Sequence, residues 1–309
     1  MIENNNSIIN NLDLGLGGLS QAKADVSINL FNKFCSAIGW LTEPYRIVRL
    51  AKANSEARLI EETTNLKIEH LKKNFPDSEA SIDRFLGEER KKQENTLSII
   101  KKTIRYLKET AKPQDIDNDW ILNFNDKSKL ISEESMQEHW ARILAEEANQ
   151  PQSFSKRTVN LMAELEKRDA EAFTNLCALK WEIFDSNNQF LFISSDFEND
   201  TSNLFNKIDY DLLIHIESIG LIKKAPLTEY FSITSDSQKG QIKHANSSYS
   251  FEFQNETTNK IIIGAVLLTP MGKELSKICN PEPIRGFEEY TSHSAPFYRN
   301  HQKAFYEWL

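Results

Sequence analysis

The sequence predicts an α+β fold that is mostly α, with helices up to residue 186 and antiparallel strands beyond it. Through most of the first part, apolar residues recur every three or four positions, which is typical of amphipathic helices. From residue 187 the pattern changes to short runs rich in Phe, Ile and Val, which are typical of strands. Hydrophobic residues make up 39% and charged residues 27%, as in globular proteins, and 309 residues allow two or three domains.

Changes in composition divide the chain into five segments. Segment 43–112 holds 16 basic and 12 acidic residues, whereas 113–309 holds 19 basic and 30 acidic ones. A basic arm beside an acidic body can indicate a polyanion or membrane partner, but solvated helix faces, which we favour, give the same counts. The segments are a flexible N-terminus (1–19), a region of amphipathic and long helices (20–112), a central helical block (113–186), a winged-helix-like α+β unit (187–279) and an aromatic C-terminal tail (280–309).

The region 20–112 carries an apolar stripe that we interpret as an oligomerisation surface. After Pro44 a long helix is expected to continue the stripe as a heptad-like seam. An isolated arm would expose more apolar surface than soluble proteins usually do, so a second subunit is the favoured partner. A membrane surface is the alternative, because Trp40 and Arg46 are of the kind that anchor helices at membranes. The oligomerisation candidates are Val26, Leu30, Phe34, Ile38, Leu41, Leu50 and Ile60.

The sequence has no feature of a secreted or membrane-spanning protein. The first residues lack the basic segment and apolar core of a secretory signal, and polar residues interrupt the most apolar stretch, 26–41. Cys35, Cys177 and Cys279 are far apart and have no metal-ligand spacing, so we predict neither a disulfide framework nor a zinc site. We expect a cytoplasmic protein, with peripheral binding at the inner membrane as the alternative.

Several helices are predicted in the central block. Asp119 is the predicted cap of a helix that begins at Trp120, and Ser132 is the predicted cap of the next helix. Ser155 is expected to cap a later helix, with apolar residues on either side forming a hydrophobic staple. The helix that follows Ser132 should bury one face, made of Met136, Trp140, Ile143, Leu144 and Ala148.

A further helix is predicted from Asp169, burying a face that runs as far as Phe184. Strands are predicted over 189–194, 230–234, 248–253 and 260–268, with a helix over 209–219 that ends at Gly220. The order of helix, SIGLI, strands and LLTPMGKELSKI resembles a winged-helix unit. Its nucleic-acid candidates are Lys223, Lys224, Lys239 and Lys243, but nearby acids favour a protein contact over DNA.

Three groups of polar residues are candidates for chemical sites. Glu138 and His139 could serve acid/base or metal chemistry, but no second histidine lies within helical reach, and a solvated acidic face is favoured. The alternating acids 115–119 lack the glycine and terminal glutamate of a calcium loop. Residues 153–157 could contact phosphate, although capping by Ser155 explains them. We therefore expect no catalytic residue, no metal and no cofactor.

Four segments occur in one order and carry a family resemblance: AIGWLTEPYRIVRLAKA, KPQDIDNDW, EESMQEHWARILAEEANQPQSFSKRT, and SIGLI with LLTPMGKEL. Together they resemble the bacterial proteins classed as domain of unknown function 2806, over roughly Ala37 to Cys279. The central block is similar, more loosely, to Abi-alpha proteins, which are associated with abortive phage infection. Only this second similarity implies a role in antiviral defence, and neither resemblance assigns a role to any residue.

The favoured hypothesis is a non-enzymatic, self-associating bacterial protein with a protein-recognition module, acting in anti-phage defence by abortive infection. Its partner would be phage-derived or encoded in the same operon. Two alternatives belong to other classes. One is a nucleic-acid-binding winged-helix regulator, and the other is a membrane-active effector that uses the N-terminal amphipathic helix.

Overall fold

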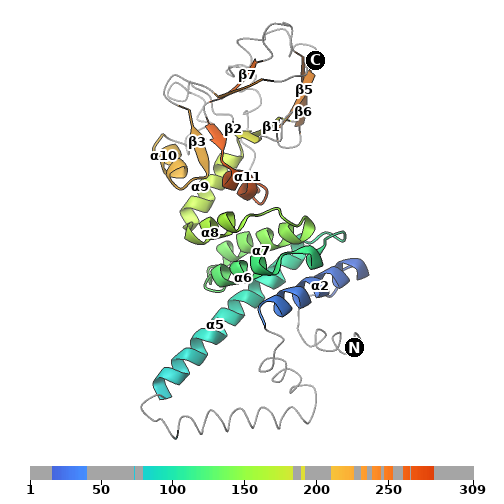
Figure 1. Cartoon of the computed structure of the whole chain (residues 1–309), viewed down its shortest axis with the longest axis vertical. Coiled ribbons are helices and arrows are strands. Elements are labelled where there is room, and N and C mark those ends of the chain that lie inside the picture. Colours follow the sequence, from blue (N-terminus) through green and yellow to red (C-terminus); the bar gives the residue numbers. More distant parts are fainter. Residues whose placement is uncertain are drawn as a thin grey trace. The chain divides into compact units, whose positions relative to one another are not determined.

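The structure is a computed structural model that describes residues 16–39, 73, 79–183, 189–191, 210–225, 231–234, 239–244, 247–252, 260–264 and 266–281. The chain divides into two compact units, Met1–Glu164 and Leu165–Leu309. The described residues form eight α-helices together with short antiparallel strands, so the predicted mostly helical fold is confirmed (Figure 1). The five segment boundaries drawn from composition stay predictions.

The first unit is a helical assembly built around α5 and α7. α7 packs along the second half of α5, and α6 packs against α8 (Figure 1). α2 contacts α6 and the 3₁₀ turn η3. Another 3₁₀ turn, η2, directly follows α5 and also contacts α7. The elements are α2 (Gln21–Ala37), α5 (Glu79–Thr103), η2 (Ile104–Tyr106), η3 (Pro113–Asp115), α6 (Asn118–Ser128), α7 (Glu134–Asn149) and α8 (Lys156–Glu164).

Side-chain caps fix where these helices begin. Asp117 caps α6 by accepting a hydrogen bond from the Trp120 amide at 2.8 Å, and Glu133 caps α7 by accepting one from the Met136 amide at 2.6 Å. The predicted caps Asp119 and Ser132 were therefore wrong by two residues and one residue, because an acceptor three residues before an unpaired amide reaches it best. Ser155 was predicted correctly: its Oγ accepts from the Thr158 amide at 3.2 Å, at the start of α8.

Four aromatic rings form the centre of the first unit. Trp140, Phe124 and Phe34 are fully buried, which confirms the predicted apolar face of α7. The Phe124 ring meets Trp140 edge-on at 5.2 Å and Phe34 edge-on at 6.1 Å, and it stacks on Trp120 at 5.2 Å. These contacts join α2, α6 and α7 into one core.

The apolar stripe of α2 therefore has partners within the chain. Leu30 and Phe34 are fully buried in the first unit, and Val26 and Ile38 are partly buried. The other oligomerisation candidates, Leu41, Leu50 and Ile60, lie outside the described residues. The stripe does not need a second subunit to cover it, and its use between subunits stays a prediction.

The described residues of the second unit form three helices and several antiparallel strands. Six strands form one sheet in the order β3-β8-β2-β1-β5-β6, and β4 pairs with β7 in a separate two-stranded sheet. The helices are α9 (Lys167–Cys177), α10 (Tyr210–Ser218) and α11 (Pro270–Ser276). The strands are β1 (Lys180–Ile183), β2 (Gln189–Leu191), β3 (Ile222–Lys224), β4 (Phe231–Thr234), β5 (Lys239–His244), β6 (Ser247–Glu252), β7 (Lys260–Gly264) and β8 (Val266–Leu268).

The predicted strands and helix of this unit are found at their expected positions, but the helix predicted from Asp169 was extended too far. It ends at Cys177, and Lys180–Ile183 forms β1 instead. Phe184, which was expected on the helix, lies outside the described residues.

Gly220 and Gly272 let α11 approach the end of α10. Gly220 has φ +83°, the left-handed conformation that closes a helix. A Cβ on Gly272 would lie 2.0 Å from the Leu221 carbonyl oxygen, a distance that no side chain tolerates. Thr269 completes the corner, because its Oγ1 donates to the Gly220 carbonyl at 2.6 Å and its amide donates to Leu221.

Within the part of the chain that the structure describes, no helix combines the length and apolar character needed to cross a bilayer.

Candidate functional site: a polar network between α5 and α7

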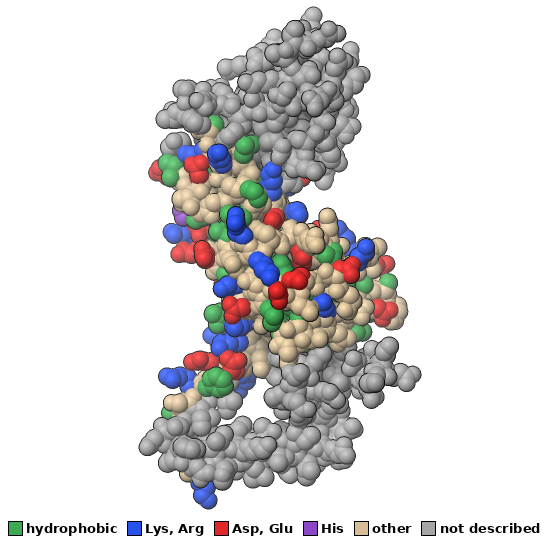
Figure 2. Space-filling view, in the orientation of Figure 1, with side chains coloured by type: hydrophobic (Ala, Val, Ile, Leu, Met, Phe, Trp, Pro, Cys, Tyr) green, Lys and Arg blue, Asp and Glu red, His purple; other side chains and the backbone are tan. Residues whose placement is uncertain are grey.

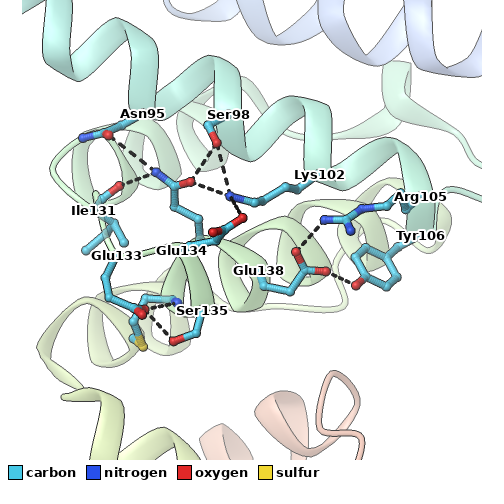
Figure 3. A network of polar contacts seen from close by, with 12 residues as sticks. Asn95, Ser98, Lys102, Arg105, Tyr106, Ile131, Glu133, Glu134, Ser135 and Glu138 are labelled. Carbon is cyan, nitrogen blue, oxygen red and sulfur yellow. Dashed lines mark hydrogen bonds and ion pairs between the residues drawn. The ribbon is translucent and has the colours of Figure 1, made fainter. Parts of the chain in front are cut away.

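Gln137 on α7 is the centre of a buried polar network between α5 and α7 (Figure 3). Its side chain is almost completely buried. Its Oε1 accepts from Ser98 Oγ at 2.7 Å and from Lys102 Nζ at 2.8 Å. Its Nε2 donates to the Ile131 carbonyl at 2.9 Å and to Asn95 Oδ1 at 3.5 Å. Both donors and both acceptor positions of the amide are thus used, which is the condition for burying it without penalty.

Lys102 brings a positive charge to the same interface. Besides Gln137, its ammonium group contacts Ser98 Oγ at 3.3 Å and Glu134 Oε1 at 3.7 Å. The Lys102 side chain is only 14% exposed, whereas that of Glu134 is 89% exposed. The Lys102 ammonium group is therefore stabilised mainly by the Gln137 and Ser98 oxygens. The attraction of Glu134 is weaker, because solvent screens its exposed carboxylate.

The next residue of α7 after Gln137, Glu138, forms a second group with η2 (Figure 3). Its Oε2 accepts from Arg105 Nη2 at 2.6 Å, and its Oε1 accepts from the Tyr106 hydroxyl. Two guanidinium groups lie near the Tyr106 ring: that of Arg142 is 5.1 Å and that of Arg105 is 5.8 Å from the centre of the ring. The solvated acidic face predicted from the sequence is found at Glu134 but not at Glu138.

Asn149 ties the last turn of α7 to the end of η2. Its Oδ1 accepts from the Lys108 amide at 2.8 Å, and its Nδ2 donates to the Tyr106 carbonyl at 3.1 Å. α7 is thus held by side-chain hydrogen bonds in its first turns and at its last residue.

The chemistry open to this network is structural. Glu138 is neutralised by Arg105, so it does not offer the unpaired carboxylate that a general base needs. His139, the neighbour singled out in the sequence, is partly exposed. Across the described ranges, no three His, Cys, Asp or Glu side chains converge in a way that could hold a metal ion.

Two carboxylates are buried among the described residues, and both bind backbone amides. Glu147 accepts from the Gln152 amide at 2.7 Å and from the Phe154 amide at 2.9 Å. These bonds hold the turn before α8, in which Gln152 has the unusual φ of 69°. Sequence reasoning counted Glu147 with Glu138 in a solvated acidic face, which is wrong because Glu147 is buried. The signal for burial is its position beside Ala148 on the apolar face of α7.

Asp169 is the second buried carboxylate. Its Oδ2 accepts from the Glu166 amide at 3.0 Å, which forms a capping box, and its Oδ1 accepts from His215 Nε2 at 2.8 Å. Burial alone would raise the pKa of Asp169, but the hydrogen bonds from His215 and Glu166 outweigh it and lower the pKa below its usual value. Asp169 is therefore ionised at neutral pH and joins α9 to α10.

The residues weighed for phosphate binding serve the helix start. Ser155 caps α8 and Ser153 is buried. The ammonium group of Lys156 lies 3.9 Å from a carboxylate oxygen of Asp117 and 3.9 Å from one of Asp119. The positive charge of Lys156 at the start of α8 is thus already paired with the carboxylates of Asp117 and Asp119.

The four nucleic-acid candidates lie on two separated strands. Lys223 and Lys224 are on β3, at one edge of the six-stranded sheet, whereas Lys239 and Lys243 are on β5, with β8, β2 and β1 between them. At about 4.8 Å per strand, β3 and β5 are roughly 19 Å apart. In the strand register, Glu252 lies opposite Lys239 and Glu182 lies opposite Lys243. The four lysines do not form one continuous basic stripe.

Removal of the Glu138 carboxylate tests whether this network is structural. Glu138→Ala leaves Arg105 and the Tyr106 hydroxyl without their acceptor, so we expect a loss of about 1–2 kcal/mol of unfolding free energy in urea titrations. Glu134→Ala is the matched control, because its carboxylate is 89% exposed and should contribute less than about 0.5 kcal/mol. Equal losses in the two variants would mean that the Glu138 contacts do not stabilise the unit.

The family of the chain follows from comparison with known proteins. The family described as "Protein of unknown function (DUF2806)" matches residues 79–292, from the first residue of α5 to beyond the end of α11. The resemblance to this family seen in the sequence is confirmed, although the match begins at 79 rather than near Ala37 and extends past Cys279. No curated protein and no solved structure matches the sequence. Because the match covers more than half of the chain, this protein belongs to the DUF2806 family.

Proposed function

We propose that this protein is a non-enzymatic scaffold that self-associates through its N-terminal helices and recognises a protein partner through its C-terminal unit. The observation that carries the proposal is that three carboxylates with little or partial exposure are all engaged in structural contacts. Glu147 and Asp169, the two that are buried among the described residues, bind backbone amides, and the partly buried Glu138 binds Arg105 and Tyr106. Carboxylates that are already paired are poor acids, bases or nucleophiles. The function that we propose is therefore binding at exposed surfaces.

The first half of α5 is the surface that best supports self-association. This half extends beyond the region where α5 packs on α6 and α7 (Figure 1). Phe85 lies on this half of α5 and is 61% exposed. A partner helix could cover this exposed apolar surface. Charges of both signs lie along it (Figure 2), including the Lys92–Glu89 pair at 2.6 Å. An exposed aromatic ring among mixed charges is typical of helices that pair with another helix.

The corner between α10 and α11 supports the recognition module. Helix α10 ends two residues before the left-handed Gly220, and the next strand is β3. β3 pairs with β8, which leads through Thr269 into α11. This succession of helix, paired strands and helix is the one expected of a winged-helix unit. Ile214 on α10 is 45% exposed and offers an apolar contact for a protein partner.

Anti-phage defence by abortive infection is the biological setting that we propose. Its support is the resemblance of the central block to Abi-alpha proteins. A self-associating scaffold with a recognition module is suited to such a role, because partner binding can change the state of an assembly without any chemical step.

Self-association is tested by light scattering after size-exclusion chromatography at micromolar concentration. We expect the full chain to form a homo-oligomer and Phe85→Glu to shift it to the monomer, because a charge would have to be buried in the interface. Leu130→Glu is the control, since Leu130 is similarly exposed, at 65%, but follows α6 rather than lying on α5. A monomeric wild-type protein would contradict the proposal, and an oligomer unaffected by Phe85→Glu would place the interface elsewhere.

The same variants separate assembly from defence in a plaque assay. Cells that express the wild type or Leu130→Glu should give fewer plaques than cells without the gene, and Phe85→Glu should lose the protection. Equal plaque numbers with and without the wild-type gene would contradict the defence role. They would not contradict the proposal of self-association.

DNA binding is the second candidate, because Lys223 is exposed on β3 directly after α10. Against it, acids outnumber basic residues in 113–309, and this excess repels phosphate. We expect fluorescence anisotropy with duplex and single-stranded DNA to show no binding above background at either of two salt concentrations. Submicromolar, salt-sensitive binding that Lys223→Ala/Lys224→Ala/Lys243→Ala abolishes would put the regulator function first.

A further inference from the structure

Two cysteines that are far apart in the sequence lie side by side in the second unit. Cys177 is the last residue of α9, and Cys279 follows the last turn of α11. Thr174 Oγ1, one turn before Cys177 on α9, donates to Cys279 Sγ at 3.7 Å. This contact brings the Cys279 sulfur against the last turn of α9, of which Cys177 is the last residue.

The two thiols differ in their access to solvent. Cys177 is 5% exposed, whereas Cys279 is partly exposed and also contacts the Leu275 carbonyl at 3.5 Å. The hydrogen bond with Cys279, together with burial, raises the pKa of Cys177 well above its usual value. Cys177 therefore remains a protonated thiol at neutral pH, and a small oxidant reaches Cys279 first.

We propose that Cys177 and Cys279 are a redox-sensitive pair that a peroxide converts into an intramolecular disulfide. In the first step the Cys279 sulfur attacks one oxygen of hydrogen peroxide. The O–O bond breaks, a sulfenic acid forms, and the released hydroxide leaves as water with the thiol proton. In the second step the Cys177 sulfur attacks the Cys279 sulfur, the S–O bond breaks, and a second water leaves with the Cys177 proton. Two thiols and one peroxide give one disulfide and two waters.

The disulfide would connect the two ends of the described part of the second unit. Helix α9 leads into β1, and β8 leads into α11, so the bond links segments that flank two strands of the same sheet. It would close a loop of roughly 100 residues, and long loops are those whose closure most restricts the unfolded chain. Oxidation should therefore make the second unit more resistant to unfolding, and reduction should reverse the effect.

Peptide mapping of the oxidised protein tests the pair. The full chain is treated with hydrogen peroxide under native conditions, unfolded, alkylated and digested with trypsin. Cys177 and Cys279 fall in tryptic peptides 169–180 and 278–285, and Cys35 falls in 34–46. We expect the first two peptides to appear cross-linked, with a mass two hydrogens below their sum, and to separate after treatment with dithiothreitol. The cross-linked protein should run as a single chain and unfold at a temperature several degrees higher than the reduced protein.

Variants separate this bond from general thiol oxidation. Cys35 lies on α2 in the first unit and is 1% exposed, so Cys35→Ser should form the cross-link as the wild type does. Cys279→Ser, at the partly exposed position, should prevent the cross-link and leave Cys177 open to alkylation after unfolding. Cys279 oxidised to sulfinic acid with Cys177 still alkylated would overturn the proposal. A cross-link between two chains, or one that includes peptide 34–46, would overturn it too.

Discussion

The first unit depends on one buried amide, that of Gln137. A side-chain amide that is moved from water into a helix interface loses its hydrogen bonds to solvent, and an unpaired one costs about 1–3 kcal/mol in proteins. The cost is avoided here because Ser98, Lys102, Asn95 and the Ile131 carbonyl supply all four partners. A shift of α5 along α7 by one turn would break these bonds together. The register of the two helices, and with it the position of Trp140 one turn later, follows from this requirement.

The charged residues near this interface follow the same rule. Lys102 is held by neutral oxygens, Glu138 by Arg105 and Tyr106, and Glu147 by two amides of the turn before α8. Each group stabilises the contact between elements that are separate in the sequence. The same use of charge occurs in the second unit, where Asp169 joins two helices through His215. For this reason we place the function on surfaces, in particular on the exposed half of α5 and on the corner between α10 and α11.

The sequence predicts the parts of the fold that depend on periodic burial. The apolar face of α7 and the Ser155 cap were expected, and strands rich in Phe and Ile were placed correctly. β3 and β5 were not predicted, because IKK and KGQIKH hold too few apolar residues to show alternation. The helix from Asp169 was drawn too long because apolar residues continue through ALKWEIF, where a helix and a strand give similar patterns.

What the sequence could not predict is which partner each residue meets. Leu30 and Phe34 form an apolar stripe whose partner could have been a second subunit or the same chain, and the structure places them in the core of their own unit. Gln137 is visible only as a polar residue three positions before Trp140 on a face expected to be apolar. The contact between Cys177 and Cys279 leaves no pattern in the sequence, because it depends on how α9 and α11 pack.

The claim that the Gln137 network holds α5 to α7 is tested most directly by a double-mutant cycle on Lys102→Met and Gln137→Leu, with unfolding free energies measured in urea. Each single change leaves a buried polar partner unsatisfied and should cost about 1–3 kcal/mol, whereas the double change removes both partners. The account predicts that the double variant loses at least about 1 kcal/mol less than the sum of the single losses. Losses that add to within about 0.5 kcal/mol would show that the two side chains act independently, and would contradict the account.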